Sequence, residues 1–135
     1  MSERLTLVAG LGCRRDCSLD DLLDLLDSTL IEHGTSTAEL AALASSEHKA
    51  DESGLQQLAA HLNLPIHFLP AEVLAGYHAR LTEISAVALH ATGSPSVAEA
   101  SALAMVEQLS GQTARLWITK RRSAVATVAV ARIDP

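Results

Sequence analysis

Aromatic residues are almost absent from this chain: its 135 residues include one Phe, one Tyr and one Trp. Charged residues make up only 19% of the sequence, and the formal net charge is −6. A protein that binds nucleic acid is expected to carry a basic surface with aromatic side chains for base stacking, so nucleic acid is not an expected partner. Because 48% of the residues are hydrophobic, the chain can bury a core built mainly from Leu, Ala, Val and Ile.

Long apolar runs are also lacking. No stretch reaches the roughly 18 residues of a membrane-spanning helix. The N-terminus, MSERLTLVAGLG, has no cationic segment followed by a long apolar stretch, as a signal peptide would have. We therefore expect a soluble, cytoplasmic protein that forms a single domain over residues 1–135 and has no membrane partner.

The chain has only two cysteines, Cys13 and Cys17, four positions apart. In the cytosol such thiols stay reduced, and zinc would need two further ligands, which no His or Cys spacing supplies. We expect no metal and no other cofactor. A helix N-terminus and neighbouring arginines would both lower the pKa of the Cys13 thiol, so a reactive thiol is an open alternative.

The first half of the chain alternates apolar runs with amphipathic segments. The run from Leu5 to Val8 predicts a buried strand that stops at a tight Gly10-x-Gly12 turn. Ser18 is predicted to cap a helix with a leucine face and an aspartate face. The elements predicted next are a strand over 40–46, a helix over 53–62 with a Ser53–Gln56 capping box, a strand over 65–69 and a one-turn helix over 71–75.

The second half predicts a helix and a hairpin. Within residues 76–95 the sequence is least informative: Ile84 to Leu89 fits a strand or a helix, and Thr92 to Ser96 predicts a loop. A Ser96–Glu99 capping box begins a helix ending at Gly111, with a buried stripe of Ala98, Ala102, Met105, Val106 and Leu109. Strands over 114–119 and 125–133 are joined by so few residues that they must form an antiparallel hairpin. Together these elements predict an α/β fold: a three-layer α/β/α domain with a mixed, partly parallel sheet.

Three loops carry the candidate binding residues: 10–18, 47–54 and 90–96. Each follows a possible strand and precedes a helix, which is where open α/β sheets bind ligands and where free N–H groups favour anions. Adjacent Arg14 and Arg15 suit carboxylates or phosphates. The candidate binding residues are Gly12, Cys13, Arg14, Arg15, Lys49, Glu52, Gly93, Glu99 and Lys120.

These residues also have structural alternatives. The two arginines would offset neighbouring acids, Glu52 and Glu99 would stabilise helix N-termini, and Lys120 would be a solvated hairpin tip. A nucleotide is not expected, because Arg15 occupies the position of the third glycine of a GxGxxG motif.

Five short motifs follow one another in an order typical of one family. They are GLGCRR at 10–15, KADESGL at 49–55, NLP at 63–65, SVAEASAL at 96–103 and KRRSAVATVAVA at 120–131. With these motifs the chain resembles the CobE family, which is similar to the C-terminal domain of CbiG, in cobalamin (vitamin B12) biosynthesis. The resemblance implies an α/β/α domain that takes part in building the corrin ring.

The resemblance also implies a ligand. Corrin intermediates are apolar rings with acetate and propionate side chains, and a rim of Arg14, Arg15, Lys49 and Lys120 would meet those carboxylates. CbiG-type proteins open a ring lactone and release acetaldehyde, but they carry N-terminal regions for which a strand at Leu5 leaves no room. We therefore expect a protein that binds or hands on a corrinoid or precorrin intermediate of the aerobic pathway.

Two alternatives remain from the same resemblance. In a lactone hydrolase or a ring-contraction accessory, Glu52 or Glu99 would act as general base, or Cys13 as nucleophile. In a scaffold, the partners would be other enzymes of the cobalamin pathway.

Overall fold

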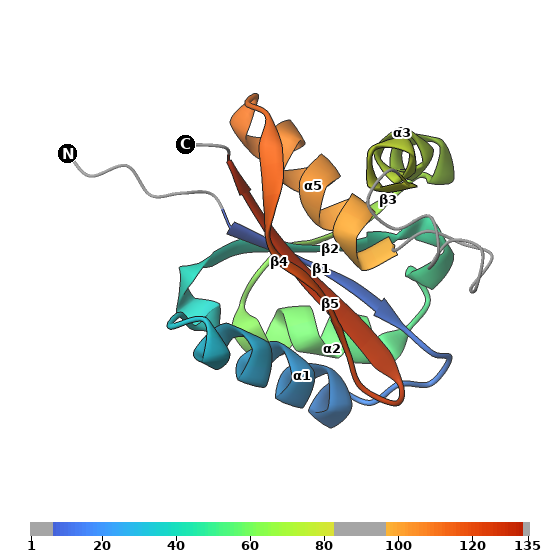
Figure 1. Cartoon of the computed structure of the whole chain (residues 1–135). Helices are drawn as coiled ribbons and strands as arrows, with labels where there is room; N and C mark the ends of the chain where they lie inside the picture. The colour runs from blue at the N-terminus through green and yellow to red at the C-terminus, as the bar shows by residue number, and fades with distance from the viewer. Residues whose placement is uncertain (1–6, 83–96, 134–135) are drawn as a thin grey trace.

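A five-stranded mixed sheet forms the centre of the molecule (Figure 1). The computed structural model describes residues 7–82 and 97–133. The strands, in the spatial order β3-β2-β1-β5-β4, are β1 Leu7–Cys13, β2 Leu40–Ser46, β3 Ile66–Leu69, β4 Ala114–Arg122 and β5 Ala126–Ile133. β1, β2 and β3 are parallel, and β5 is antiparallel to both of its neighbours. β4 therefore runs in the same direction as β1, so the two strands end at the same edge of the sheet.

Within the described residues, two helices cover each face of this sheet (Figure 1). α1 (Leu19–Glu32) and α2 (Ser53–Leu62) pack on one face, and α3 (Ala71–Thr82) and α5 (Val97–Ser110) pack on the other. Each face has its own apolar cluster, rich in leucine under α1 and α2 and in alanine under α5. The predicted three-layer α/β/α fold with a mixed sheet and a C-terminal hairpin is confirmed.

The start of α1 follows its sequence signal. The Ser18 side chain caps the helix by accepting a hydrogen bond from the backbone N–H of Asp21 at 3.1 Å. Leu22, Leu26 and Leu30 are fully buried against the sheet. The predicted cap and apolar face are both confirmed.

β1 differs from its prediction, because it continues through both glycines to Cys13. Gly10 lies in the strand where α5 crosses it, and a Cβ at this position would collide with the backbone carbonyl of Ala98. A Cβ at Gly12 would lie 2.7 Å from the Thr127 hydroxyl on the neighbouring strand. The predicted tight turn is therefore wrong: these glycines permit close packing instead.

Helices α2, α3 and α5 also depart from their predictions. The Ser53–Gln56 capping box is absent: Glu52 is the N-cap of α2, and the Gln56 side chain donates to the Ala50 carbonyl instead. α3 extends to Thr82, well beyond one turn. α5 is buried from Ala98 to Val106, whereas Leu109, predicted to be buried, is 48% exposed. The predicted Ser96 cap, the segment from Ile84 to Leu89 and the loop at Gly93 lie outside the described residues.

β4 is longer than predicted and carries two bulges. Residues 120–122, predicted as the hairpin loop, form the last part of the strand. Between Leu116 and Ile118, β4 advances two residues while its partner β5 advances one, so Trp117 is an extra residue. Between Ile118 and Arg121, β4 again contains one residue more than β5. Such bulges reorient the side chains beside them.

Candidate functional site

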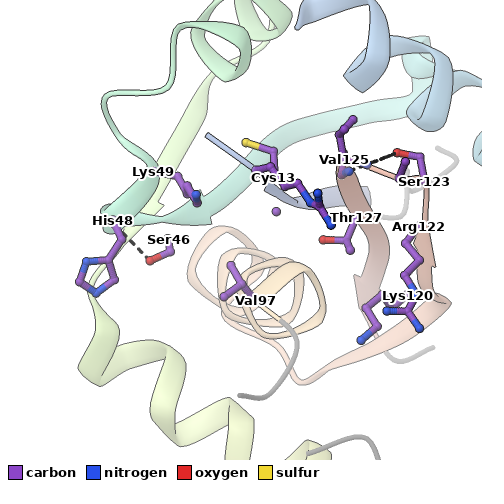
Figure 2. Close-up of a pocket in the computed structure, with 14 residues that line it drawn as sticks. Cys13, Ser46, His48, Lys49, Val97, Lys120, Arg122, Ser123, Val125 and Thr127 are labelled. Carbon is purple, nitrogen blue, oxygen red and sulfur yellow. Dashed lines mark hydrogen bonds between the residues drawn. The ribbon is translucent and has the colours of Figure 1, made fainter. Parts of the chain in front are cut away.

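A hollow of about 440 Å³, called here the cationic hollow, lies at the edge where β1, β2 and β4 end (Figure 2). Its walls come from the ends of these strands, the short turn η2 (Glu47–Lys49), the start of α5 and the β4–β5 turn. The lining residues are Gly12, Cys13, Arg14, Ser46, His48, Lys49, Val97, Lys120, Arg122, Ser123, Ala124, Val125, Ala126 and Thr127.

The charge of this lining is one-sided. Four cationic side chains line it, those of Arg14, Lys49, Lys120 and Arg122, and none of its described residues is acidic. Figure 2 shows Lys49 on one side of the hollow and Lys120 with Arg122 on the opposite side. Within residues 7–82 and 97–133, no ion pair neutralises any of the four. Four unneutralised cations in a chain of net charge −6 make a local attraction for anions.

The adjacent arginines at the end of β1 are separated by the structure. The backbone N–H of Arg14 donates to the Val125 carbonyl at 2.8 Å, which holds this residue beside the hairpin turn. Arg14 lines the hollow, whereas the exposed Arg15 does not. The structure therefore brings only one of the two to the hollow.

Adjacent arginines in β4 are also separated, because successive side chains of a strand point to opposite faces of the sheet. Arg122 pairs with Thr127 across the hairpin and lines the hollow. The preceding Arg121 forms an ion pair with Glu32 of α1, on the other face of the sheet, at 2.5 Å. Lys120 and Arg122 both line the hollow. Only Lys120 was a candidate binding residue from the sequence.

Glu52 lies outside the lining and connects two loops. Its Oε1 accepts a hydrogen bond of 2.9 Å from the backbone N–H of Asp16, whose φ of 65° places it in the left-handed region. A Cβ at Gly54 would collide with the Cys17 carbonyl, so the start of α2 packs directly on the β1–α1 loop. Glu52 thus supports the loop that carries Arg14.

Glu99 is also absent from the lining. It is 9% exposed, and its Oε2 accepts a hydrogen bond of 3.0 Å from the backbone N–H of Lys120. This contact ties the start of α5 to the end of β4, so Glu99 supports the strand segment that carries two of the cations.

Cys13 lines the hollow as a protonated thiol. Burial, together with the nearby Cys17, raises its pKa from 9.0 to about 11. Burial and the Asp21 carboxylate likewise raise the pKa of Cys17. Both cysteines are free thiols. The lowering of the Cys13 pKa that arginines and a helix N-terminus would produce is therefore outweighed by desolvation.

Several lining residues were not identified from the sequence. Ser46 is the last residue of β2 and His48 follows the strand, and the Ser46 hydroxyl accepts a hydrogen bond of 3.2 Å from the His48 backbone N–H. Thr127 lies beside Gly12 across the β1–β5 pair. Isolated polar residues at strand ends carry no distinctive spacing, so only the assembled sheet brings them together.

Two features are absent from the described residues, a metal site and a membrane-spanning helix. No group of three His, Cys, Asp or Glu side chains in residues 7–82 and 97–133 is arranged to hold a metal ion. Over the same residues, no helix combines the length and apolar character that crossing a bilayer requires.

A family model matches most of this chain. Residues 7–131 match the family model described as Cobalamin synthesis G C-terminus. Since this match spans nearly the whole chain, the chain belongs to that family and is a cobalamin biosynthesis protein.

Individual relatives point the same way. Protein CobE from Sinorhizobium sp is 33% identical over 125 residues, which cover 93% of this chain and 79% of that protein. The crystal structure of CobE, a protein from the cobalamin (vitamin B12) biosynthetic pathway, is 50% identical with a TM-score of 0.88, covering 100% of this chain and 98% of that one. The resemblance to the CobE family is confirmed.

Two further structures share the fold. The cobalamin biosynthesis protein chiG from Agrobacterium tumefaciens str. C58 is 32% identical with a TM-score of 0.74, covering 96% of this chain and 100% of that one. A cobalamin biosynthesis protein G homolog from Sulfolobus solfataricus is 20% identical with a TM-score of 0.70, covering 97% of this chain but only 38% of the longer one. At that identity, the second likeness concerns the fold alone.

Proposed function

We propose that the cationic hollow binds a carboxylate-rich corrinoid or precorrin intermediate of the aerobic cobalamin pathway and hands it on to another enzyme. The observation that carries this proposal is the lining, which has four cationic side chains and no acidic one among the described residues. A corrin intermediate with acetate and propionate side chains is a polyanion near neutral pH. Arginine pairs with such carboxylates through two parallel hydrogen bonds.

The rest of the lining supports a partly apolar ligand. Val97, Ala124, Val125 and Ala126 offer small apolar contacts between the cations. A volume of about 440 Å³ lies within the range of small-molecule pockets, but the hollow is open to solvent. A macrocycle would be held along one edge, and the free edge would be accessible to the protein that receives it.

The lactone-hydrolase alternative has less support. Its candidate nucleophile, Cys13, is a thiol whose pKa is raised to about 11, so the reactive thiolate is scarce near neutral pH. Its candidate bases, Glu52 and Glu99, accept hydrogen bonds from backbone amides and do not line the hollow. These observations favour binding over catalysis by these three residues.

The test compares two corrinoids that differ in charge. Absorbance titration with dicyanocobyrinic acid, which carries free carboxylates, should show saturable binding that weakens as NaCl screens the cations. Cyanocobalamin, whose side chains are amides, should bind at least about tenfold more weakly, because hydrogen bonds to charged groups contribute roughly 1.5–3 kcal/mol each.

Three results would contradict the proposal. Equal affinity for the acid and the amide would show that the cations do not select the ligand. Release of acetaldehyde from the lactone intermediate by the purified protein would establish the hydrolase instead. If neither corrinoid binds but enzymes of the pathway co-purify with the chain, the scaffold alternative is correct.

A further inference from the structure

A second hollow, of about 640 Å³, lies at the opposite end of the sheet, and neither the family nor the proposed function assigns it a role. It is called here the tryptophan hollow. It is formed where α1 ends, β1 begins and the far end of the hairpin meets them. Its lining residues are Leu7, His33, Gly34, Thr35, Ser36, Glu39, Trp117 and Arg132.

The first β4 bulge places an aromatic side chain, that of Trp117, in the wall of this hollow. Trp117 is the extra residue between the paired positions Leu116 and Ile118. Its ring meets His33 edge-on, with centroids 6.0 Å apart and planes at 70°. The His33 Nδ1 lies 2.9 Å from the Thr29 carbonyl oxygen and donates to it, which fixes the imidazole. The indole is thus held in a defined position at the wall.

Arg132 of β5 forms no ion pair within residues 7–82 and 97–133. Its guanidinium lies over the Trp117 ring, 5.4 Å from the centroid. Its Nε is buried and has no hydrogen-bond partner among the residues that the structure describes. Buried N–H groups in native proteins are nearly always paired, so an unpaired one requires an explanation. A small rotation toward the hollow would present Nε and one terminal nitrogen to a ligand carboxylate.

The opposite charge also lines the hollow. Glu39 is a lining residue, yet within the described residues it forms no ion pair with Arg132. The carboxyl end of α1, where the helix dipole is negative, lies at the same wall. One part of the lining therefore attracts a carboxylate and another attracts a cation, an arrangement that disfavours a multiply charged anion.

We propose that the tryptophan hollow binds a small zwitterion, with its carboxylate on Arg132 and its ammonium group facing Glu39, as a small amino acid would provide. This site goes beyond the corrinoid proposal and does not depend on it. The apolar part of the ligand would contact Leu7 and the accessible edge of Trp117.

Trp117 is the only tryptophan in the chain, so its fluorescence reports on this hollow alone. The full chain is titrated at constant ionic strength with glycine, L-alanine, acetate, methylammonium and inorganic phosphate, and the single indole N–H signal is followed by NMR in parallel. Glycine or alanine should give a saturable change. Acetate and methylammonium, which each offer one of the two charges, should bind at least about tenfold more weakly.

Matched variants connect the signal to the two charges. Arg132→Lys, which keeps the charge but loses the planar fork, should weaken alanine binding about tenfold. Glu39→Gln should remove the preference for alanine over acetate. Arg115→Lys, opposite Arg132 on β4 but outside the lining, should leave alanine binding unchanged, and none of the three should alter corrinoid binding.

Three outcomes would overturn the proposal. One is the absence of any saturable change with amino acids in both fluorescence and NMR. Another is phosphate binding as tight as alanine binding, which would indicate a simple anion site. The third is unchanged alanine affinity in both Arg132→Lys and Arg132→Gln, each shown to be folded by circular dichroism.

Discussion

The two hollows share one sheet but arrange their charges in opposite ways. The cationic hollow gathers four positive side chains from three separate elements with no acid among its described lining residues. The tryptophan hollow sets one arginine and one glutamate around a fixed indole. A ligand with many like charges suits the first, and a ligand with one charge of each sign suits the second. The contrast shows that a net charge of −6 says little about what either end of the molecule attracts.

The largest expected effect comes from two double variants with the same change in net charge. Arg14→Ala with Arg122→Ala should weaken dicyanocobyrinic acid binding about hundredfold, because two charge-assisted contacts are lost. Arg15→Ala with Arg121→Ala should leave the affinity within about twofold, since neither residue lines the cationic hollow. Absorbance titration measures both.

Equal weakening of dicyanocobyrinic acid binding in the two double variants would contradict the distinction between lining and non-lining arginines. It would mean that the ligand responds to the overall field of the protein and not to the cationic lining. The alanine titration of Trp117 should be unchanged in both, which confirms that the tryptophan hollow is intact.

A smaller effect concerns Cys13, the one thiol in the cationic lining. In a Cys17→Ala background, iodoacetamide should alkylate Cys13 at pH 8 more than about tenfold more slowly than in the urea-unfolded chain. The reason is that desolvation raises its pKa to about 11 from 9.0. A rate profile that titrates at or below pH 9 would restore Cys13 as a candidate nucleophile.

The same shift has a consequence for stability. Between pH 9 and about 11 the folded chain holds a proton on Cys13 that the unfolded chain has lost. The contribution of Cys13 to the free energy of unfolding is therefore fully present below pH 9 and falls as the pH rises toward 11. Urea denaturation of the wild type and Cys13→Ala across this range should show a steeper decline for the wild type.

The smallest expected effect concerns Glu52. Glu52→Ala removes the acceptor for the Asp16 N–H and should lower the free energy of unfolding by about 1 kcal/mol. Corrinoid affinity should fall about threefold as the Arg14 loop loosens. Glu52→Gln retains an acceptor oxygen and should bind the corrinoid like the wild type. If Glu52 were a general base, both variants would lose catalytic activity.

The fold was predictable where the signal is local. Ser18 predicts the start of α1 because its hydroxyl reaches a backbone N–H three residues away. The segment from Leu40 to Ala44 is apolar, and β2 has the predicted bounds of 40–46. The Gly10-x-Gly12 turn failed because the need for glycine comes from the α5 backbone at Ala98, nearly 90 positions along the chain.

The candidate site was predictable in part for the same reason. The loops after β1 and β2 meet because parallel strands end at one edge, which places Arg14 and Lys49 in one lining. The direction in which each side chain points could not be predicted from the sequence. Arg14 and Arg122 line the hollow, whereas their chain neighbours Arg15 and Arg121 do not. Which member of each pair lines it depends on the hairpin register and the shape of the turn after β1.

The second bulge in β4 determines which face of the sheet each of the following side chains occupies. If β4 continued from Ile118 without the extra residue, Lys120 would pair with Val128 and Arg121 with Thr127. Arg121 would then leave its ion pair with Glu32 and turn toward the cationic hollow, while Lys120 would turn toward α1. A one-residue deletion or insertion upstream of Arg121 could thus exchange which basic side chains face each layer, with no change in composition.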